Sequence, residues 1–165
     1  HADRIAVACL AQLVNVIAPI RTSPSGNAWR QTIYYPFALA ARYARGEVLR
    51  VEHSSARYTT ARAEVNVTEV VMTHDAETGA LTIFALNRDQ QQTVGLDVDL
   101  SAFPILTVVE HLYLGGEDLD GVNTEAQPER VTPRPGRGAV IDNGRLTVAL
   151  APVSWTMLHL APPPR

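Results

Sequence analysis

The sequence has one cysteine, no lysine and no long hydrophobic run, and each of these absences excludes a class of protein. The single thiol of Cys9 cannot form a disulfide within the chain, and its place in an apolar stretch predicts buried packing rather than nucleophilic chemistry. No run approaches the roughly 18 apolar residues that a membrane-spanning helix needs, so we expect no membrane partner. The opening residues HADRIAVACLAQ also lack the pattern of a secretory signal peptide, which favours a cytoplasmic location.

The absence of lysine leaves arginine as the source of all 14 basic charges, against 17 acidic residues and a net charge of −3. With an isoelectric point near 5.9, this balance argues against a nucleic-acid partner. The chain is 165 residues long and 46% hydrophobic, which is enough to bury an ordinary core. These values predict one folded domain, or one domain with part of another, and exclude intrinsic disorder.

Residues 1–46 differ in pattern from the rest of the chain. The apolar run Ile5–Leu10 fits either a strand buried on both faces or a buried helical turn. Proline and glycine then predict a loop over residues 12–27. From residue 28 to 45 apolar side chains recur at helical spacing, and Gly46 follows where a helix cap is expected. The predicted apolar face of this helix consists of Ile33, Phe37, Ala40, Ala41 and Ala44.

From residue 47 onward the sequence alternates as β-strands do. Two runs, 65–72 and 81–87, flank the turn residues Asp75–Gly79 and predict a β-hairpin. In Val94–Leu100 every second residue is apolar, which places one face of that strand in a core. Further strands are expected over residues 106–114, 145–150 and 154–160. Several short strands with regular turns predict an antiparallel β-sandwich.

A strand, a loop and a helix cannot form a domain alone, because a lone strand leaves its backbone polar groups unsatisfied. The simplest interpretation is that residues 1–46 are the last βα unit of a larger α/β domain. Residues 47–165 would then form a complete, or nearly complete, sandwich domain. The expected fold is therefore mostly β.

The carboxylates and histidines show no catalytic or metal-binding pattern. Asp97 and Asp99 fall on the outer face of an alternating strand, where they cannot act as a pair across a pocket. No two histidines have the spacing of a helical zinc site. We therefore expect no catalytic residue and no metal site in this chain.

Three side chains in the first part are the candidate substrate-binding residues: Gln12, Asn15 and Trp29. If residues 5–11 form a parallel barrel strand, Gln12 lies at its C-terminal end, where barrel active sites are built. Its amide can donate to and accept from a sugar hydroxyl, and Trp29 can line a sugar subsite. The alternative is that Gln12 and Asn15 cap backbone groups of the loop and that Trp29 anchors the helix in the core.

Several stretches of sequence carry a family resemblance. HADRIAVACLAQLVNVIAPIRT and AWRQTIYYPFALAARYARG resemble the C-terminal part of glycoside hydrolase family 51, the α-L-arabinofuranosidases. LTIFALNRD, VVEHLYLGGEDLDGVNT and LAPVSWTMLHL resemble the domain that ends those enzymes. The resemblance covers nearly the whole chain in order, although Arg21 stands where the family commonly has a hydrophobic residue.

The resemblance implies a (β/α)8 barrel followed by a jelly-roll-like β-sandwich, with residues 1–46 as the last barrel strand, loop and helix. It implies a retaining enzyme that removes terminal α-L-arabinofuranosyl groups from arabinan, arabinoxylan and related oligosaccharides. Gln12 looks like the family's glutamine that hydrogen-bonds the terminal arabinose, with Asn15 and Trp29 near the same rim. The resemblance also implies a cytoplasmic homo-oligomer, often a hexamer, and no cofactor.

The two glutamates of the retaining mechanism would lie on barrel strands that precede residue 1, so we expect the 165-residue chain to be inactive by itself. A second hypothesis is a non-catalytic carbohydrate-binding or domain-docking β-sandwich. Such a module would need exposed aromatic side chains on which sugar rings stack.

Overall fold

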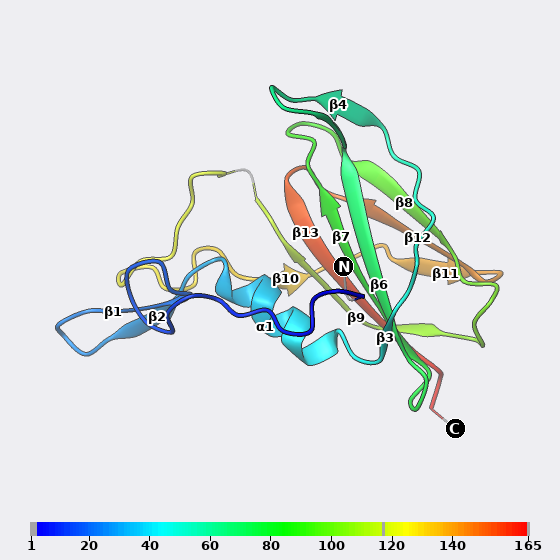
Figure 1. The fold of residues 1–165 in the computed structure, drawn as a ribbon, viewed down its shortest axis with the longest axis horizontal. Helices are drawn as coiled ribbons and strands as arrows, with labels where there is room; N and C mark the ends of the chain where they lie inside the picture. The colour runs from blue at the N-terminus through cyan, green and yellow to red at the C-terminus, as the bar shows by residue number, and fades with distance from the viewer. Residues whose placement is uncertain (1–2, 117, 165) are drawn as a thin grey trace.

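The computed structural model describes residues 3–116 and 118–164, which form mainly antiparallel β-strands (Figure 1). The larger sheet contains β3 (Glu47–Val48), β6 (Thr68–Asp75), β7 (Ala80–Asn87), β9 (Thr107–Leu114), β10 (Arg134–Pro135) and β13 (Ser154–Ala161). The smaller sheet contains β8 (Val94–Asp99), β11 (Val140–Asp142) and β12 (Arg145–Leu150). Outside the sheets lie the hairpins β1 (Ile20–Thr22) with β2 (Ala28–Arg30) and β4 (Arg57–Thr59) with β5 (Glu64–Asn66), and the helix α1 (Tyr34–Tyr43).

The core lies between the two sheets. The strand order is β10-β9-β13-β7-β6-β3 in one sheet and β11-β12-β8 in the other, with antiparallel pairing throughout. Alternate positions along each strand point inward, and their aliphatic side chains exclude water. The inward side chains are Leu81, Ile83, Leu158 and Leu160 from the larger sheet and Leu96, Leu146, Val148 and Leu150 from the smaller. The predicted sandwich is confirmed.

Most predicted strands of the sandwich are confirmed as well, but the run 65–72 is divided between β5 and β6, which belong to different sheets. β6 and β7 form the expected hairpin, in which Asp75 pairs with Ala80 and Gly79 donates its N–H back to the Asp75 carbonyl. In β8, Leu96 is buried while Asp97 and Asp99 are exposed, as the alternation predicts. The hairpin follows from local patterning because its two strands are neighbours in the chain, and the faces of β8 follow from its own alternation although its partner β12 is distant.

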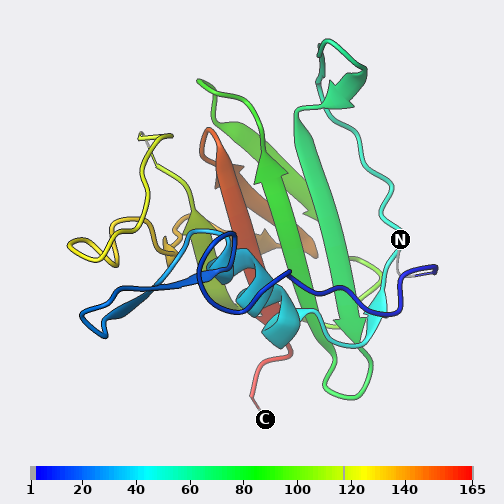
Figure 2. The same cartoon turned by 60° about the vertical axis from the view of Figure 1, so that its left-hand side comes forward.

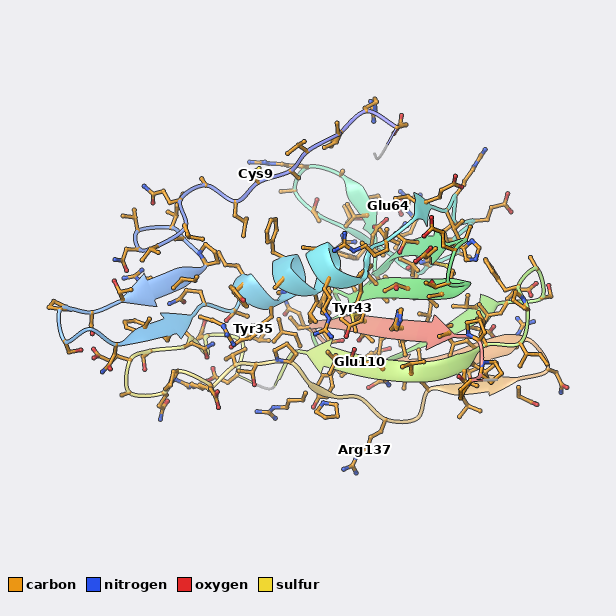
Figure 3. All side chains as sticks on the ribbon, turned by 90° about the horizontal axis from the view of Figure 1, so that it is seen from below. Cys9, Tyr35, Tyr43, Glu64, Glu110 and Arg137 are labelled. Atoms are coloured by element: carbon orange, nitrogen blue, oxygen red, sulfur yellow. The ribbon has the colours of Figure 1, made fainter. Side chains whose placement is uncertain are left out.

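Helix α1 covers the outer face of the larger sheet (Figure 2, Figure 3). The Tyr43 ring lies 5.0 Å from the His159 ring, and the Tyr43 hydroxyl donates to Glu110. Thr82 donates its hydroxyl proton to the Tyr43 carbonyl and lies 3.0 Å from His159 Nδ1. Burial lowers the pKa of His159, which favours the neutral ring. Since the Thr82 proton is already used, Nδ1–H of His159 is the donor in that contact.

Several expectations for residues 1–46 are wrong. The run Ile5–Leu10 forms neither strand nor helix, and Cys9 is exposed (Figure 3). A buried strand needs neighbours to pair with, and no strand of the described chain lies beside this run. The helix predicted over residues 28–45 is also too long, since Ala28–Arg30 pairs with β1 as a strand. Pro36 lies in the first turn of α1, where its missing N–H breaks no helical hydrogen bond.

The predicted apolar face of the helix does not face the sheet. Ile33 is 51% exposed and Phe37 43% exposed, whereas the contacts to the sheet come from Tyr43. The side of α1 that a globular helix would bury therefore lies in water in this chain.

Gly46 does not cap the helix, which ends at Tyr43 with the N–H of Ala44 bonded to Ala40, but it makes the turn onto the sheet. Its φ is +75°, and a Cβ there would lie 2.1 Å from the carbonyl oxygen of His74. Glycine is required by both the backbone conformation and the close approach of β6.

We predict that Gly46→Ala destabilises the chain by about 2 kcal/mol or more, because it combines a left-handed φ with a clash against backbone. Gly95→Ala is the matched control, since an added Cβ in β8 has nothing within 4 Å. Urea denaturation followed by circular dichroism measures both. Equal stability of the two variants would show that the turn tolerates a side chain.

Candidate functional site

The candidate residues lie in the segment that precedes helix α1. Gln12 is exposed, and its side chain makes no hydrogen bond to any residue that the structure describes. Its φ is +57°, and Asn15 and Val16 follow with φ of +61° and +53°. A positive φ is strained for a β-branched residue such as Val16, and strain of this kind clusters at functional sites. Gln12 therefore presents a free amide on a strained backbone.

Asn15 ties this backbone to the hairpin β1–β2. Its Oδ1 accepts from the backbone N–H of Thr22 at 2.7 Å, and its Nδ2 donates to Thr22 Oγ1 at 2.8 Å. The backbone N–H of Asn15 also donates to the carbonyl of Ile20 at 2.8 Å. The Asn15 side chain therefore uses one donor and one acceptor position within the protein. This is the alternative role, in which Asn15 caps groups of the loop.

Trp29 is half-buried on β2 and points its indole N–H at the connection between β9 and β10. The indole Nε1 donates to the carbonyl of Asn123 at 3.1 Å. Asn123 is only 3% exposed, and its Nδ2 donates to the carbonyl of Arg30 at 2.9 Å. The structure thus joins Asn15 and Trp29 through one hairpin, and shows no contact of Gln12 with either among the described residues.

Glu125 makes a second link between this connection and the hairpin. Its Oε1 accepts from Ser25 Oγ at 2.6 Å, Ser23 Oγ at 2.8 Å and Asn27 Nδ2 at 2.9 Å. These hydrogen bonds, that of Ser25 above all, hold the pKa of the Glu125 carboxyl below its usual value. The ionised form is therefore the one that holds the tip of the hairpin.

A separate cavity of about 890 Å³ lies at one end of the larger sheet. Its wall includes the aromatic side chains of Tyr58, Tyr113 and Trp155, and Arg130 on its wall pairs with Asp118. Asp118 is the only carboxylate among the described residues that line it. In the described part of the chain, no three histidine, cysteine, aspartate or glutamate side chains are grouped closely enough to hold a metal ion.

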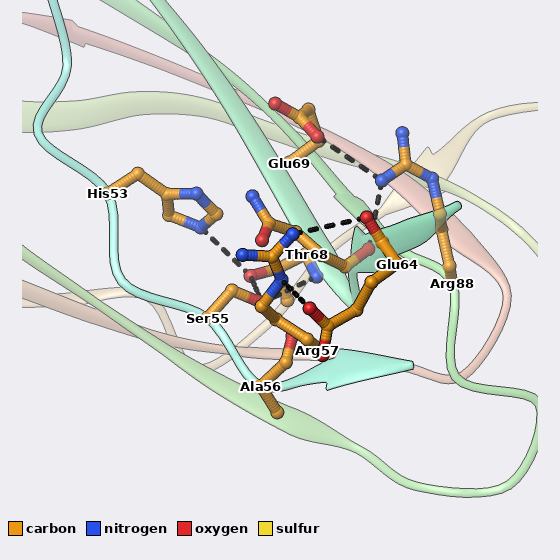
Figure 4. Close-up of polar contacts among 9 residues, drawn as sticks. His53, Ser55, Ala56, Arg57, Glu64, Thr68, Glu69 and Arg88 are labelled. Carbon is orange, nitrogen blue, oxygen red and sulfur yellow. Dashed lines mark hydrogen bonds and ion pairs between the residues drawn. The ribbon is translucent and has the colours of Figure 1, made fainter. Parts of the chain in front are cut away.

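A polar cluster beside β6 fixes the hairpin β4–β5 (Figure 4). His53 Nε2 and Ser55 Oγ both lie 3.0 Å from Thr68 Oγ1, and Arg57 pairs with Glu64 at 3.4 Å. These hydrogen bonds and the ion pair join the β4–β5 hairpin to β6, which is a structural role.

A family model described as the α-L-arabinofuranosidase C-terminal domain matches residues 1–154. This chain belongs to that family. It is 48% identical over 164 residues to an intracellular exo-α-(1→5)-L-arabinofuranosidase of Streptomyces lividans, covering 99% of this chain and 25% of the relative. A relative of the same description from Halalkalibacterium halodurans is 42% identical, with 97% of this chain and 32% of the relative covered.

A solved structure of a family 51 α-L-arabinofuranosidase from Bifidobacterium longum has a TM-score of 0.89 and 39% identity to this arabinofuranosidase domain. The match covers 96% of this chain and 31% of that chain. The resemblance to family 51 noted in the sequence is confirmed. The chain spans about a quarter to a third of the length of the curated relatives it matches. No helix in its described residues is both long and apolar enough to cross a membrane.

The sequence patterns did not indicate a role for Asn123 or Glu125. Both lie in a polar, glycine-containing stretch that is typical of a solvated loop, and their partners are more than ninety positions earlier. One feature of the sequence does point to them: the stretch between β9 and β10 is long and has no pattern of a helix or strand. Such long connections are uncommon in compact domains and usually have a function.

We predict that Glu125→Gln loosens the tip of the hairpin at neutral pH and shifts the emission of Trp29 to the red, measured with Trp155→Phe so that Trp29 is the sole reporter. Folding lowers the pKa of Glu125 from its ordinary value of 4.5. The stabilisation of the hairpin by this carboxylate is therefore complete above pH 4.5, and it is lost as the pH falls through the lower pKa of the folded state. The unsubstituted hairpin should therefore show its own red shift below pH 4.5, and Glu125→Gln should show none.

Glu129→Gln, an exposed carboxylate in the same connection, serves as the control and should leave the emission and its pH dependence unchanged. A red shift of Trp29 emission centred above pH 4.5, or the same red shift in Glu125→Gln, would show that Glu125 is not the group that titrates.

Proposed function

We propose that this chain is the C-terminal part of a retaining α-L-arabinofuranosidase. The enzyme would release terminal α-L-arabinofuranosyl groups from arabinan, arabinoxylan and related oligosaccharides. The observation that carries the proposal is the 48% identity, over 164 residues, to a relative whose name describes that exo-activity. Residues 1–46 would belong to the catalytic (β/α)8 barrel and residues 47–165 to the accessory sandwich. A cytoplasmic location and a homo-oligomer such as a hexamer remain part of the proposal.

The exposed apolar side chains of the first 46 residues support this division. Val7, Leu13 and Val16 are each more than 70% exposed, and Phe37 is 43% exposed. Contiguous apolar surface of this kind marks a face that another part of the protein covers. A barrel that supplied neighbouring strands and helices would bury both the Ile5–Leu10 run and the outer side of α1.

Within this chain, Gln12 is the residue best suited to contact the sugar. Its carboxamide is exposed and has no partner among the described residues, so it can donate to one hydroxyl and accept from another. Asn15 and Trp29 would act nearer the rim, since part of each side chain is engaged within the protein. The two carboxyl groups of the retaining mechanism would come from the barrel.

We predict that the full-length protein hydrolyses para-nitrophenyl α-L-arabinofuranoside and that the 165-residue chain alone does not. In the full-length protein, Gln12→Ala should lower kcat/KM about 10- to 100-fold, the loss expected for one or two sugar hydrogen bonds. Gln91→Ala, at an exposed position between β7 and β8, is the control and should keep the original kinetics.

A full-length protein without arabinofuranosidase activity would refute the proposed function. Unchanged kinetics in Gln12→Ala would leave the function standing and remove Gln12 from the site.

A further inference from the structure

We propose that Asn123 is a positioning residue for the candidate sugar-binding loop. Its buried carboxamide fixes the hairpin β1–β2 and, through Asn15, the backbone that presents Gln12. The inference rests on the proposed function, and it assigns the sandwich a part in substrate binding although its own residues do not reach the sugar.

Every polar group of the Asn123 side chain has a partner. Nδ2 donates to the carbonyls of Arg30 and Val131, both at 2.9 Å, and Oδ1 accepts from the N–H of Val131 at 2.7 Å. Its own carbonyl accepts from the indole of Trp29 at 3.1 Å and from Gln31 Nε2 at 3.5 Å. The bonds to Val131 lie within the connection, whereas the bonds to Arg30, Trp29 and Gln31 would be lost if the hairpin moved away. Because Asn123 is buried, losing them would leave an Nδ2–H and its main-chain carbonyl unsatisfied, so Asn123 favours one position of β2.

The position of β2 sets the position of the loop. β1 pairs with β2 in a fixed register, with Arg21 opposite Trp29 and Thr22 opposite Ala28. Thr22 is the partner of the Asn15 side chain, and Asn15 lies three positions after Gln12. The path from Asn123 thus consists of hydrogen bonds as far as Asn15, and three residues of backbone then lead from Asn15 to Gln12.

The connection that carries Asn123 is built for contact with this hairpin. It runs from the end of β9 to the start of β10 and has no helix or strand among its described residues. Asn123 holds the base of the hairpin at Arg30, and Glu125 holds the tip at Ser25 and Asn27. Because the short hairpin is held at two points, both its orientation and its distance from the sandwich are fixed.

The test is Asn123→Asp in the full-length protein, which keeps the acceptor for Val131 N–H and turns an oxygen toward two carbonyl oxygens. We expect KM for para-nitrophenyl α-L-arabinofuranoside to rise and kcat/KM to fall about tenfold or more, because small displacements of a binding group are costly. In a protein that already carries Gln12→Ala, Asn123→Asp should lower kcat/KM further by only about twofold or less, since both substitutions act through the same contact with the sugar.

A spectroscopic readout, a matched control and a second, milder substitution separate positioning from simple loss of folding. In the 165-residue chain with Trp155→Phe, Asn123→Asp should shift Trp29 emission to the red. Asn143→Asp, at the exposed turn between β11 and β12, is the matched control and should change nothing. Glu125→Gln loosens the same hairpin more gently, so it should raise KM about two- to threefold even if Asn123→Asp does not fold.

A fall in kcat at unchanged KM, or effects of Asn123→Asp and Gln12→Ala that multiply, would overturn the positioning role. Unchanged Trp29 emission in Asn123→Asp would overturn it whatever the activity. An inactive wild-type full-length protein would instead refute the proposed function, and with it the catalytic consequence of the hairpin's position.

Discussion

The carboxamide of Asn123 joins the beginning of the chain to the β-sandwich, and the arrangement of residues 12–31 depends on it. A hairpin with strands of three residues is not stable alone in water. Burying an amide is favourable only when all its hydrogen-bonding groups are satisfied, which here requires both the hairpin and the Val131 backbone. The buried amide and the short hairpin therefore stabilise each other, and Asn15 extends that order toward Gln12.

Helix α1 shows the same dependence between parts. Its inner side is polar where it meets the sheet, through the contacts of Tyr43 with Glu110, Thr82 and His159. Phe37 of the same helix is 43% exposed. An exposed aromatic side chain on a helix that already packs on a sheet supports the proposal that a barrel covers the helix in the longer protein. The arabinofuranosidase relatives, which are three to four times as long, fit that arrangement.

How far the sequence predicts the fold depends on the distance between partners. The β6–β7 hairpin and the alternation in β8 follow from neighbouring residues, and both were predicted correctly. Ile5–Leu10 was predicted as regular structure because its composition suits a buried element, yet it has nothing to pair with in this chain. Glu125 was not predicted because its partners are about a hundred positions away and its surroundings are those of an ordinary loop. The candidate residues Gln12, Asn15 and Trp29 came from their place after the predicted strand and from a family resemblance, and the structure adds how the latter two are held.

Hydrogen exchange of single backbone amides in the 165-residue chain tests most directly whether the sandwich holds the candidate loop. The N–H of Thr22 donates to Asn15 Oδ1, that of Gln31 to the Pro19 carbonyl, and that of Val131 to Asn123 Oδ1. We predict that these three amides are protected and that Asn123→Asp releases Thr22 and Gln31, while Val131, whose acceptor is kept, and the amides of β7 and β13 stay protected. Exchange of Thr22 and Gln31 at the rate of an unstructured peptide in the unsubstituted chain, or their continued protection in Asn123→Asp, would contradict this link between the sandwich and the loop.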